Sequence, residues 1–123
     1  SDHKPNDPRE RLRIEKLGGK SQITKAPGDD WRIVNLSVSR SFGDLDATPY
    51  VTHKPDVKII ANHTDDQFVI LACDGLWDVM TNEMAVKYVL EHSDQKENIG
   101  KLLAKEAIQL GTSDNVTAVV VWF

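Results

Sequence analysis

The sequence predicts a mixed α and β fold in which two strands flank a pair of helices. Residues 67–73 contain six consecutive apolar residues, several of them β-branched or aromatic, which indicates a strand buried on both faces. Residues 116–123 are equally rich in strand-forming side chains and predict a second strand. Between them lie two segments with apolar residues at helical spacing. This order predicts an α/β domain of the α+β type.

The first of these helices is predicted from Thr81, a typical N-cap residue, to His92. Its apolar side is formed by Val86, Val89 and Leu90.

The second helix is predicted to open at residues 94–97, which have capping-box spacing, and to close at Gly111. Its predicted buried stripe consists of Ile99, Leu102, Leu103, Ala107 and Leu110.

The N-terminal part of the chain has weaker patterns. Residues 8–17 predict a short helix, since proline suits a first turn and the two glycines that follow end it. Residues 20–30 are typical of a projecting loop, with Gly, Pro and Asp interrupting any periodicity. Residues 31–38 form a mixed apolar segment of no clear type, and residues 57–61 predict an edge or peripheral strand.

The composition limits the classes of function. The 123 residues are 40% hydrophobic and 28% charged, which is typical of a soluble globular domain. No apolar run reaches the ~18–20 residues that span a bilayer, and a net charge of −4 argues against a general nucleic-acid binder. We therefore expect neither a membrane nor a nucleic acid as partner. A single cysteine excludes an internal disulfide and favours a reducing cytoplasmic or nuclear location.

Two carboxylates occupy comparable places beside the two predicted strands. Asp74 follows the first strand and Asp114 precedes the second. If these strands pair antiparallel, both acids lie at one rim of the sheet, where their charges repel each other unless a proton or a cation intervenes. Oxygen ligands without a Cys/His cluster suit Mg²⁺ or Mn²⁺. Asp78, four residues after Asp74, is a candidate third ligand.

The spacing alone leaves a second interpretation open for these acids. Asp-Gly and Ser-Asp-Asn are common turn sequences, so Asp74 and Asp114 also fit simple turn capping. Arg40 is similarly ambiguous, because its guanidinium suits a phosphoryl oxygen but also an ion pair with Asp44. The four histidines have no metal-ligand or triad spacing, and among them only His3 is retained as a candidate.

Five segments, in order along the chain, resemble the protein phosphatase 2C family of metal-dependent serine/threonine phosphatases. They are DHKP (residues 2–5), ERLRIEKLGG (10–19), LSVSRSFGD (36–44), ILACDGLWDV (70–79) and SDNVTAVVV (113–121). They are distributed over nearly the whole chain, from residue 2 to residue 121, so the resemblance favours metal binding over turn capping at Asp74 and Asp114.

The resemblance implies a four-layer α-β-β-α sandwich with antiparallel sheets, of which residues 1–123 would be the C-terminal half, with a flap at about residues 19–35. It implies a binuclear Mg²⁺ or Mn²⁺ centre with Asp74 and Asp114 as ligands and Asp78 beside an additional, weaker metal. Arg40 matches an arginine near the site. The implied reaction is dephosphorylation of phosphoserine and phosphothreonine in proteins, by attack of a metal-bridging hydroxide on phosphorus.

Departures from the family pattern define a competing hypothesis. The family's Asp-Gly-His-Gly-Gly segment is absent from these residues, and residues 31–36 lack the glycine usually found before the Leu36 segment. We therefore expect the isolated chain to be inactive without the missing N-terminal half of the domain as its partner. The alternative is a non-catalytic, phosphatase-like interaction module.

Overall fold

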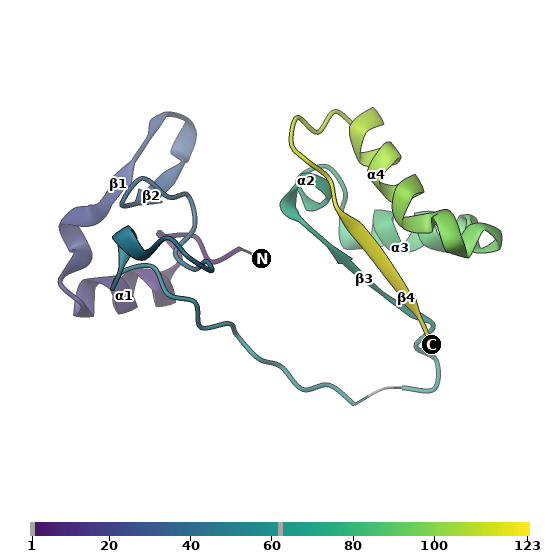
Figure 1. Ribbon diagram of the computed structural model, residues 1–123, viewed down its shortest axis with the longest axis horizontal. Helices are drawn as coiled ribbons and strands as arrows, with labels where there is room; N and C mark the ends of the chain where they lie inside the picture. Colours follow the sequence, from purple (N-terminus) through teal and green to yellow (C-terminus); the bar gives the residue numbers. More distant parts are fainter. Residues whose placement is uncertain (1, 62) are drawn as a thin grey trace. The chain divides into compact units, whose positions relative to one another are not determined.

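The computed structural model describes residues 2–61 and 63–123, which divide into two compact units, Ser1–Ile59 and Ile60–Phe123 (Figure 1). The fold is of the α+β class, as predicted, with helices and two separate antiparallel strand pairs in the described part of the chain. None of the helices in the described ranges is long and apolar enough to cross a membrane.

The first unit begins with helix α1 (Pro8–Lys16), which confirms the helix predicted there. The sequence analysis did not identify its N-cap: Asp7 Oδ1 accepts hydrogen bonds from the backbone N–H groups of Arg9 and Glu10, at 2.8 and 3.4 Å. Of the helix's apolar residues only Ile14 is fully buried. A short 3₁₀ helix (Gly19–Gln22) follows.

The predicted loop over residues 20–30 instead contains regular structure. Strands β1 (Ile23–Lys25) and β2 (Trp31–Ile33) form an antiparallel hairpin, joined through a 3₁₀ turn (Pro27–Asp29). Facing residues Lys25 and Trp31 contribute a cation–π contact, with the ammonium 5.7 Å from the ring centroid. The loop prediction was wrong because each strand is only three residues long, too short to show a periodic pattern.

A tight turn follows β2. It lies within residues 31–36, the segment without the glycine expected before Leu36. Ile33 and Leu36 pair across it, so Val34 and Asn35 are its two central residues, with φ of 48° and 71°. Positive φ at both central positions is characteristic of a type I′ turn, which favours Asn-Gly. A β-branched residue is unfavourable in this region, so Val34 is strained. The rest of the unit includes one further 3₁₀ turn (Leu45–Ala47).

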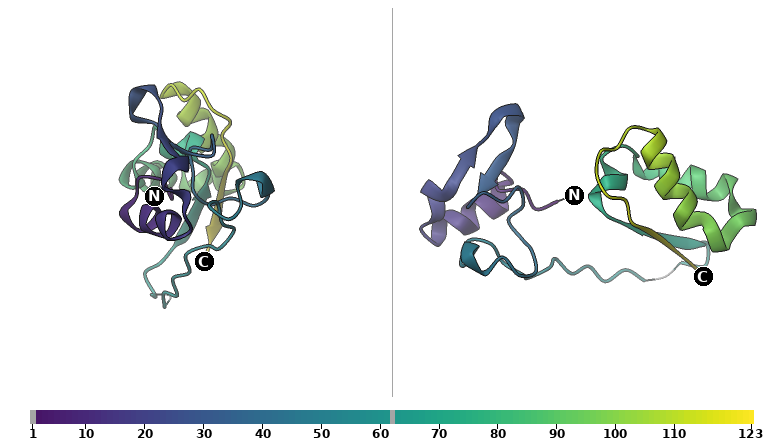
Figure 2. Two further views of the ribbon diagram at one scale, coloured as in Figure 1. Left: turned by 90° about the vertical axis from the view of Figure 1, so that its left-hand side faces the viewer. Right: turned by 45° about the horizontal axis from the view of Figure 1, so that its top comes forward.

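The second unit is built on strands β3 (Phe68–Ala72) and β4 (Ala118–Trp122). They pair antiparallel, with Phe68 opposite Trp122 and Ala72 opposite Ala118. Helix α2 (Asp74–Trp77) follows β3 directly, and helices α3 (Asn82–Glu91) and α4 (Ile99–Gln109) lie on one face of the strand pair (Figures 1 and 2).

Only one face of this strand pair is covered. The inward residues of β3 and β4 pack on a core of Leu76, Met80, Ala85, Val89, Ile99, Leu103 and Ala107. The alternate residues Val69, Leu71, Val119 and Val121 are 39–57% exposed. The prediction that the first strand is buried on both faces was therefore wrong for this chain. Its continuous apolar run supplies one face to the helices and leaves the other bare.

Both predicted helices are present, with differences at their ends and faces. Thr81 caps α3 as predicted, because its hydroxyl oxygen accepts the N–H of Met84 at 3.2 Å. The predicted capping box does not open α4; those residues belong to a 3₁₀ segment (Ser93–Asn98), while Gly111 ends the helix with φ of 95°. The predicted stripes are only partly buried, since Val86, Leu90 and Leu110 remain 42–46% exposed.

The strand predicted at residues 57–61 is absent. These residues are exposed and have no strand partner within the described ranges, and Val57, Ile59 and Ile60 are 65–94% exposed. An extended segment becomes a sheet strand only when a neighbour accepts and donates its backbone hydrogen bonds. The β-prone composition was recognised correctly, but composition does not supply that neighbour.

The strained turn gives the first testable prediction. Replacing Val34→Asn together with Asn35→Gly should stabilise the first unit by about 1 kcal/mol, because the pair then suits the type I′ turn. Thermal unfolding followed through the NMR amide signals of residues 2–59 measures the change. Val38→Asn, at a half-buried valine whose φ is not positive, is the control and should destabilise. A lower melting temperature for the double variant would contradict the strain.

Candidate metal-binding rim

The β3–β4 pairing brings Asp74 and Asp114 to the same end of the strand pair, as the sequence analysis predicted for antiparallel strands. Ala72 faces Ala118, and just beyond them the Cys73 N–H donates to the carbonyl oxygen of Thr117 at 3.1 Å. The next residues on each side carry the two acids. A Cβ built on Gly75 would lie 3.5 Å from the Cβ of Asp114, so the two turns touch.

Both carboxylates are exposed and make a local hydrogen bond. Asp74 Oδ1 accepts the N–H of Gly75 at 3.0 Å, and Asp114 Oδ1 accepts the N–H of Asn115 at 2.7 Å. The turn-capping interpretation therefore describes a real contact of each acid. It does not exclude cation binding, because an ionised carboxylate offers about four lone-pair sites on two oxygens.

Asp78 lies one helical turn beyond Asp74. The sequence analysis expected a tight turn opened by Gly75; the structure has helix α2 there, with Asp78 as its C-cap. The Asp78 N–H donates to the Asp74 carbonyl oxygen at 2.8 Å. Residues four apart on a helical turn share a face, so Asp78 is exposed on the same side of α2 as Asp74.

The donor chemistry of this rim fits a hard divalent cation. All three candidate ligands are carboxylates, which Mg²⁺ and Mn²⁺ prefer. The set is nevertheless incomplete: within the described residues, no group of three or more His, Cys, Asp or Glu side chains is arranged to hold a metal ion. These residues thus supply part of a metal site.

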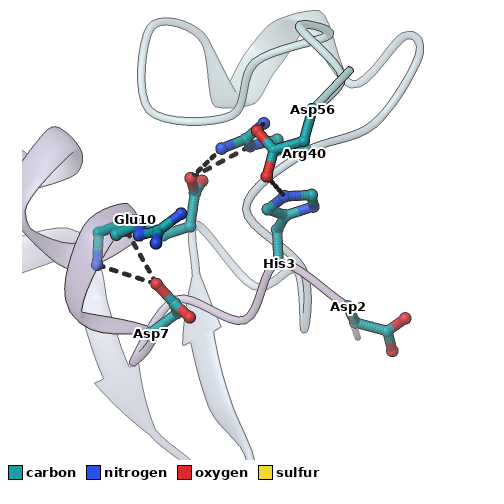
Figure 3. A pocket seen from close by; sticks show the side chains of 7 residues that line it. Asp2, His3, Asp7, Glu10, Arg40 and Asp56 are labelled. Atoms are coloured by element: carbon teal, nitrogen blue, oxygen red, sulfur yellow. Dashed lines mark hydrogen bonds and ion pairs between the residues drawn. The ribbon is translucent and has the colours of Figure 1, made fainter. Parts of the chain in front are cut away.

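Arg40 belongs to a different cluster, in the first unit (Figure 3). Its Nε and Nη2 donate to Glu10 Oε1 at 3.1 and 2.5 Å. Its Nη1 donates to Asp56 Oδ1 at 2.8 Å and to the Lys54 carbonyl oxygen at 3.0 Å. Four of the five guanidinium N–H groups are therefore engaged. The ion pair with Asp44, one of the two alternatives for Arg40, is not formed; Asp44 accepts instead from the Ser41 hydroxyl at 2.6 Å.

Glu10 is the buried centre of this cluster. Its side chain is 2% exposed, and its carboxylate also accepts from the Ser39 hydroxyl at 2.6 Å and from Arg13 at 2.9 Å. Burial acts to raise the pKa of Glu10, but hydrogen bonds from Arg40, Ser39 and Arg13 outweigh it and lower the pKa from 4.5 to about 2. Glu10 is therefore a fixed negative charge that links α1 to residues 39 and 40.

His3 joins the cluster through Asp56, and its selection from the four histidines as a candidate functional residue stays a prediction. His3 Nε2 lies 3.0 Å from Asp56 Oδ2 (Figure 3). Hydrogen bonds from His3 and Arg40 lower the pKa of Asp56 from 3.8 to about 2. The sequence analysis missed Glu10 and Asp56. The position of Glu10, four residues before buried Ile14 on α1, was the available signal.

Comparison with known proteins identifies the family. A family model described as "Protein phosphatase 2C" matches residues 1–116. The chain belongs to the protein phosphatase 2C family. The motifs that carried the resemblance thus lie in a chain whose family is established.

Relatives within the protein phosphatase 2C family differ in how much of their length the chain covers. A "PP2C-like domain-containing protein R307" of Acanthamoeba polyphaga mimivirus is 40% identical over 99% of this chain and is covered to 80%. Human "Protein phosphatase 1B" is 39% identical, and the chain covers 27% of it. The crystal structure of a serine-threonine phosphatase 2C from Toxoplasma gondii matches with a TM-score of 0.85 and 28% identity, over 100% of this chain and 46% of that one.

The buried cluster gives the second testable prediction. Because the folded-state pKa of Glu10 lies below its ordinary value, its contribution to stability is fully present above pH 4.5 and is lost as the pH falls towards 2. Glu10→Gln should lower the free energy of unfolding of the first unit by about 3 kcal/mol near neutrality. The difference from wild type should shrink as the pH falls through that window.

Urea unfolding followed by the amide signals of residues 2–59, between pH 7 and 2, measures this difference. Glu15→Gln removes the surface partner of Arg11 on the same helix and is the matched control, with an expected effect below about 0.5 kcal/mol. A Glu10→Gln effect that does not vary with pH would show that the glutamate's charge is not responsible.

Proposed function

We propose that the complete protein containing this chain is a Mg²⁺- or Mn²⁺-dependent phosphatase that acts on phosphoserine and phosphothreonine in proteins. The observation that carries the proposal is the rim at which Asp74 and Asp114, forty positions apart, are brought into neighbouring turns. Membership of the protein phosphatase 2C family supports the reaction class.

The residues of this chain have distinct roles in the proposed site. Asp74 and Asp114 would hold a divalent cation, and Asp78, on the same face of α2 as Asp74, would orient water. Bound divalent cations supply a water of lowered pKa and offset the negative charge of the phosphoryl oxygens. A nucleophilic side chain is not required, which is consistent with the engagement of the only cysteine, Cys73, whose thiol donates to the carbonyl oxygen of Asn115 on the facing segment.

A role for Arg40 in binding a phosphoryl oxygen remains a prediction, and the contacts that Arg40 makes do not favour it. A phosphoryl oxygen competes with two carboxylates and a backbone carbonyl for its donors. Its observed contacts favour a role in ordering the first unit. The cytoplasmic or nuclear location also remains a proposal, supported by the single cysteine.

A second candidate function is a non-catalytic, phosphatase-like module. The mimivirus relative favours it, because that protein is short. The chain covers 80% of its length but only 27% of the length of human Protein phosphatase 1B. The sequence upstream of residue 1 in the parent protein discriminates the two. An intact Asp-Gly-His-Gly-Gly segment there favours catalysis, and its loss favours the module.

The third prediction concerns the metal ligands. In the complete protein, Asp74→Ala and Asp114→Ala should each lower Mn²⁺-dependent release of phosphate from phosphopeptides by more than about 100-fold, since losing a ligand exceeds the 10–100-fold effect of outer-shell changes. Asp94→Ala, an exposed acid of the same unit, is the control and should leave the rate unchanged. Full activity in both ligand variants would refute the proposed centre.

The fourth prediction concerns residues 1–123 in isolation. They should show negligible phosphatase activity at any Mn²⁺ concentration, because the described carboxylates do not complete a three-ligand site. Phosphopeptide hydrolysis measured with the chain alone, and again after adding the separately produced upstream half of the domain, tests this. Mn²⁺-dependent turnover by the chain alone would show that these residues suffice.

A further inference from the structure

The carbonyl group of Asn115 is contacted by both residues that flank Asp74. The Cys73 thiol donates to the carbonyl oxygen of Asn115 at 3.2 Å. The same sulfur accepts the N–H of Thr117, also at 3.2 Å. Cys73 therefore bridges two positions on the segment that leads from Asp114 into β4. The bridge extends the strand pairing past its last backbone pair and up to the rim.

Gly75 also lies directly against this carbonyl group. A Cβ at this position would overlap the carbonyl oxygen of Asn115 and lie 3.0 Å from its carbonyl carbon. Gly75 is buried, and its φ lies outside the left-handed region that favours glycine. Glycine is therefore required for the close approach of two backbone segments, not for an unusual conformation.

The consequence concerns the two acids between these contacts. Asp74 stands between Cys73 and Gly75, and Asp114 immediately precedes Asn115, so the grip on Asn115 sets the separation of the two carboxylates. Two neighbouring carboxylates repel each other when no cation is bound. A rigid backbone contact holds them near each other in the metal-free protein and lowers the reorganisation needed for binding.

We propose that Cys73 and Gly75 are positioning residues for the metal site: they clasp the Asn115 backbone and so pre-arrange Asp74 and Asp114 for one divalent cation. This inference rests on the proposed metal-binding function. Neither residue is a ligand, because the sulfur is directed to backbone groups of the facing segment and glycine has no side chain.

A second glycine in the same unit separates positioning from ordinary packing. Gly100 on α4 lies against β4, and a Cβ there would lie 2.5 Å from the carbonyl oxygen of Ala118 and 3.4 Å from its carbonyl carbon. Gly75→Ala and Gly100→Ala thus introduce the same methyl group against a backbone carbonyl of the same strand region. Only Gly75→Ala disturbs the carbonyl group of Asn115, the residue next to Asp114.

The experiment is a Mn²⁺ titration of the 123-residue chain, followed by paramagnetic broadening of the amide signals of Asp74 and Asp114. In the wild type, both signals should broaden with one apparent dissociation constant. Gly75→Ala should weaken that constant on the order of 10-fold or more, as outer-shell changes do. Gly100→Ala should reduce the unit's stability and leave the constant unchanged.

The cysteine provides an independent pair of variants in case Gly75→Ala does not fold. Cys73→Ala removes both bonds to the facing segment and should also weaken Mn²⁺ binding on the order of 10-fold. Cys73→Ser should restore affinity close to wild type, because a hydroxyl both donates and accepts hydrogen bonds. A purely structural role predicts loss of stability without this pattern of affinities.

Three negative outcomes are distinguishable. Wild-type Mn²⁺ affinity in folded Gly75→Ala and Cys73→Ala overturns the clasp and leaves the metal site intact. Absence of selective broadening at Asp74 and Asp114 in the wild type, both alone and with the upstream half of the domain added, overturns the metal site and the clasp's role together. Equal weakening in Gly75→Ala and Gly100→Ala assigns the effect to packing of the unit and also overturns the clasp.

Discussion

The antiparallel hydrogen bonds between β3 and β4 determine both the core and the rim of the second unit. Their register places Ala72 opposite Ala118, so the residues just beyond meet at one end of the pair. The same register directs Phe68, Ile70, Val120 and Trp122 to the helices. A slip by one residue would turn these side chains to the opposite face and separate the two acidic turns. The register that forms the core therefore also places the two acids.

The first unit depends on a different constraint, a buried charge. A carboxylate removed from water is tolerated only when its charge and lone pairs are satisfied, and Glu10 meets this condition with three side-chain donors. Those donors come from α1 itself and from residues 39–40, and Arg40 also donates a hydrogen bond to Asp56. The unit contains few buried apolar residues, namely Ile14, Ile33, Ala47 and Val51, so this polar network carries an unusual share of its order.

The sequence predicted those features that depend on local patterns. The two long helices of the second unit were recognised by apolar spacing, with Thr81 and Gly111 at their ends, and the two strands by composition. The proximity of Asp74 and Asp114 was predictable because antiparallel pairing needs only the order of the strands. Features that depend on a distant partner were missed. The Glu10–Arg40 contact spans 30 positions, and residues 57–61 lack the neighbour that a strand requires.

The bare face and the incomplete rim belong to the same two strands, and this links them physically. Val69, Leu71, Val119 and Val121 leave an apolar surface beside the rim that holds Asp74 and Asp114. An apolar sheet face favours burial against another element. Whatever covers this face packs on the same two strands whose register places Asp74 and Asp114 in neighbouring turns. Burial of the apolar face and completion of the rim are therefore coupled through one strand pair.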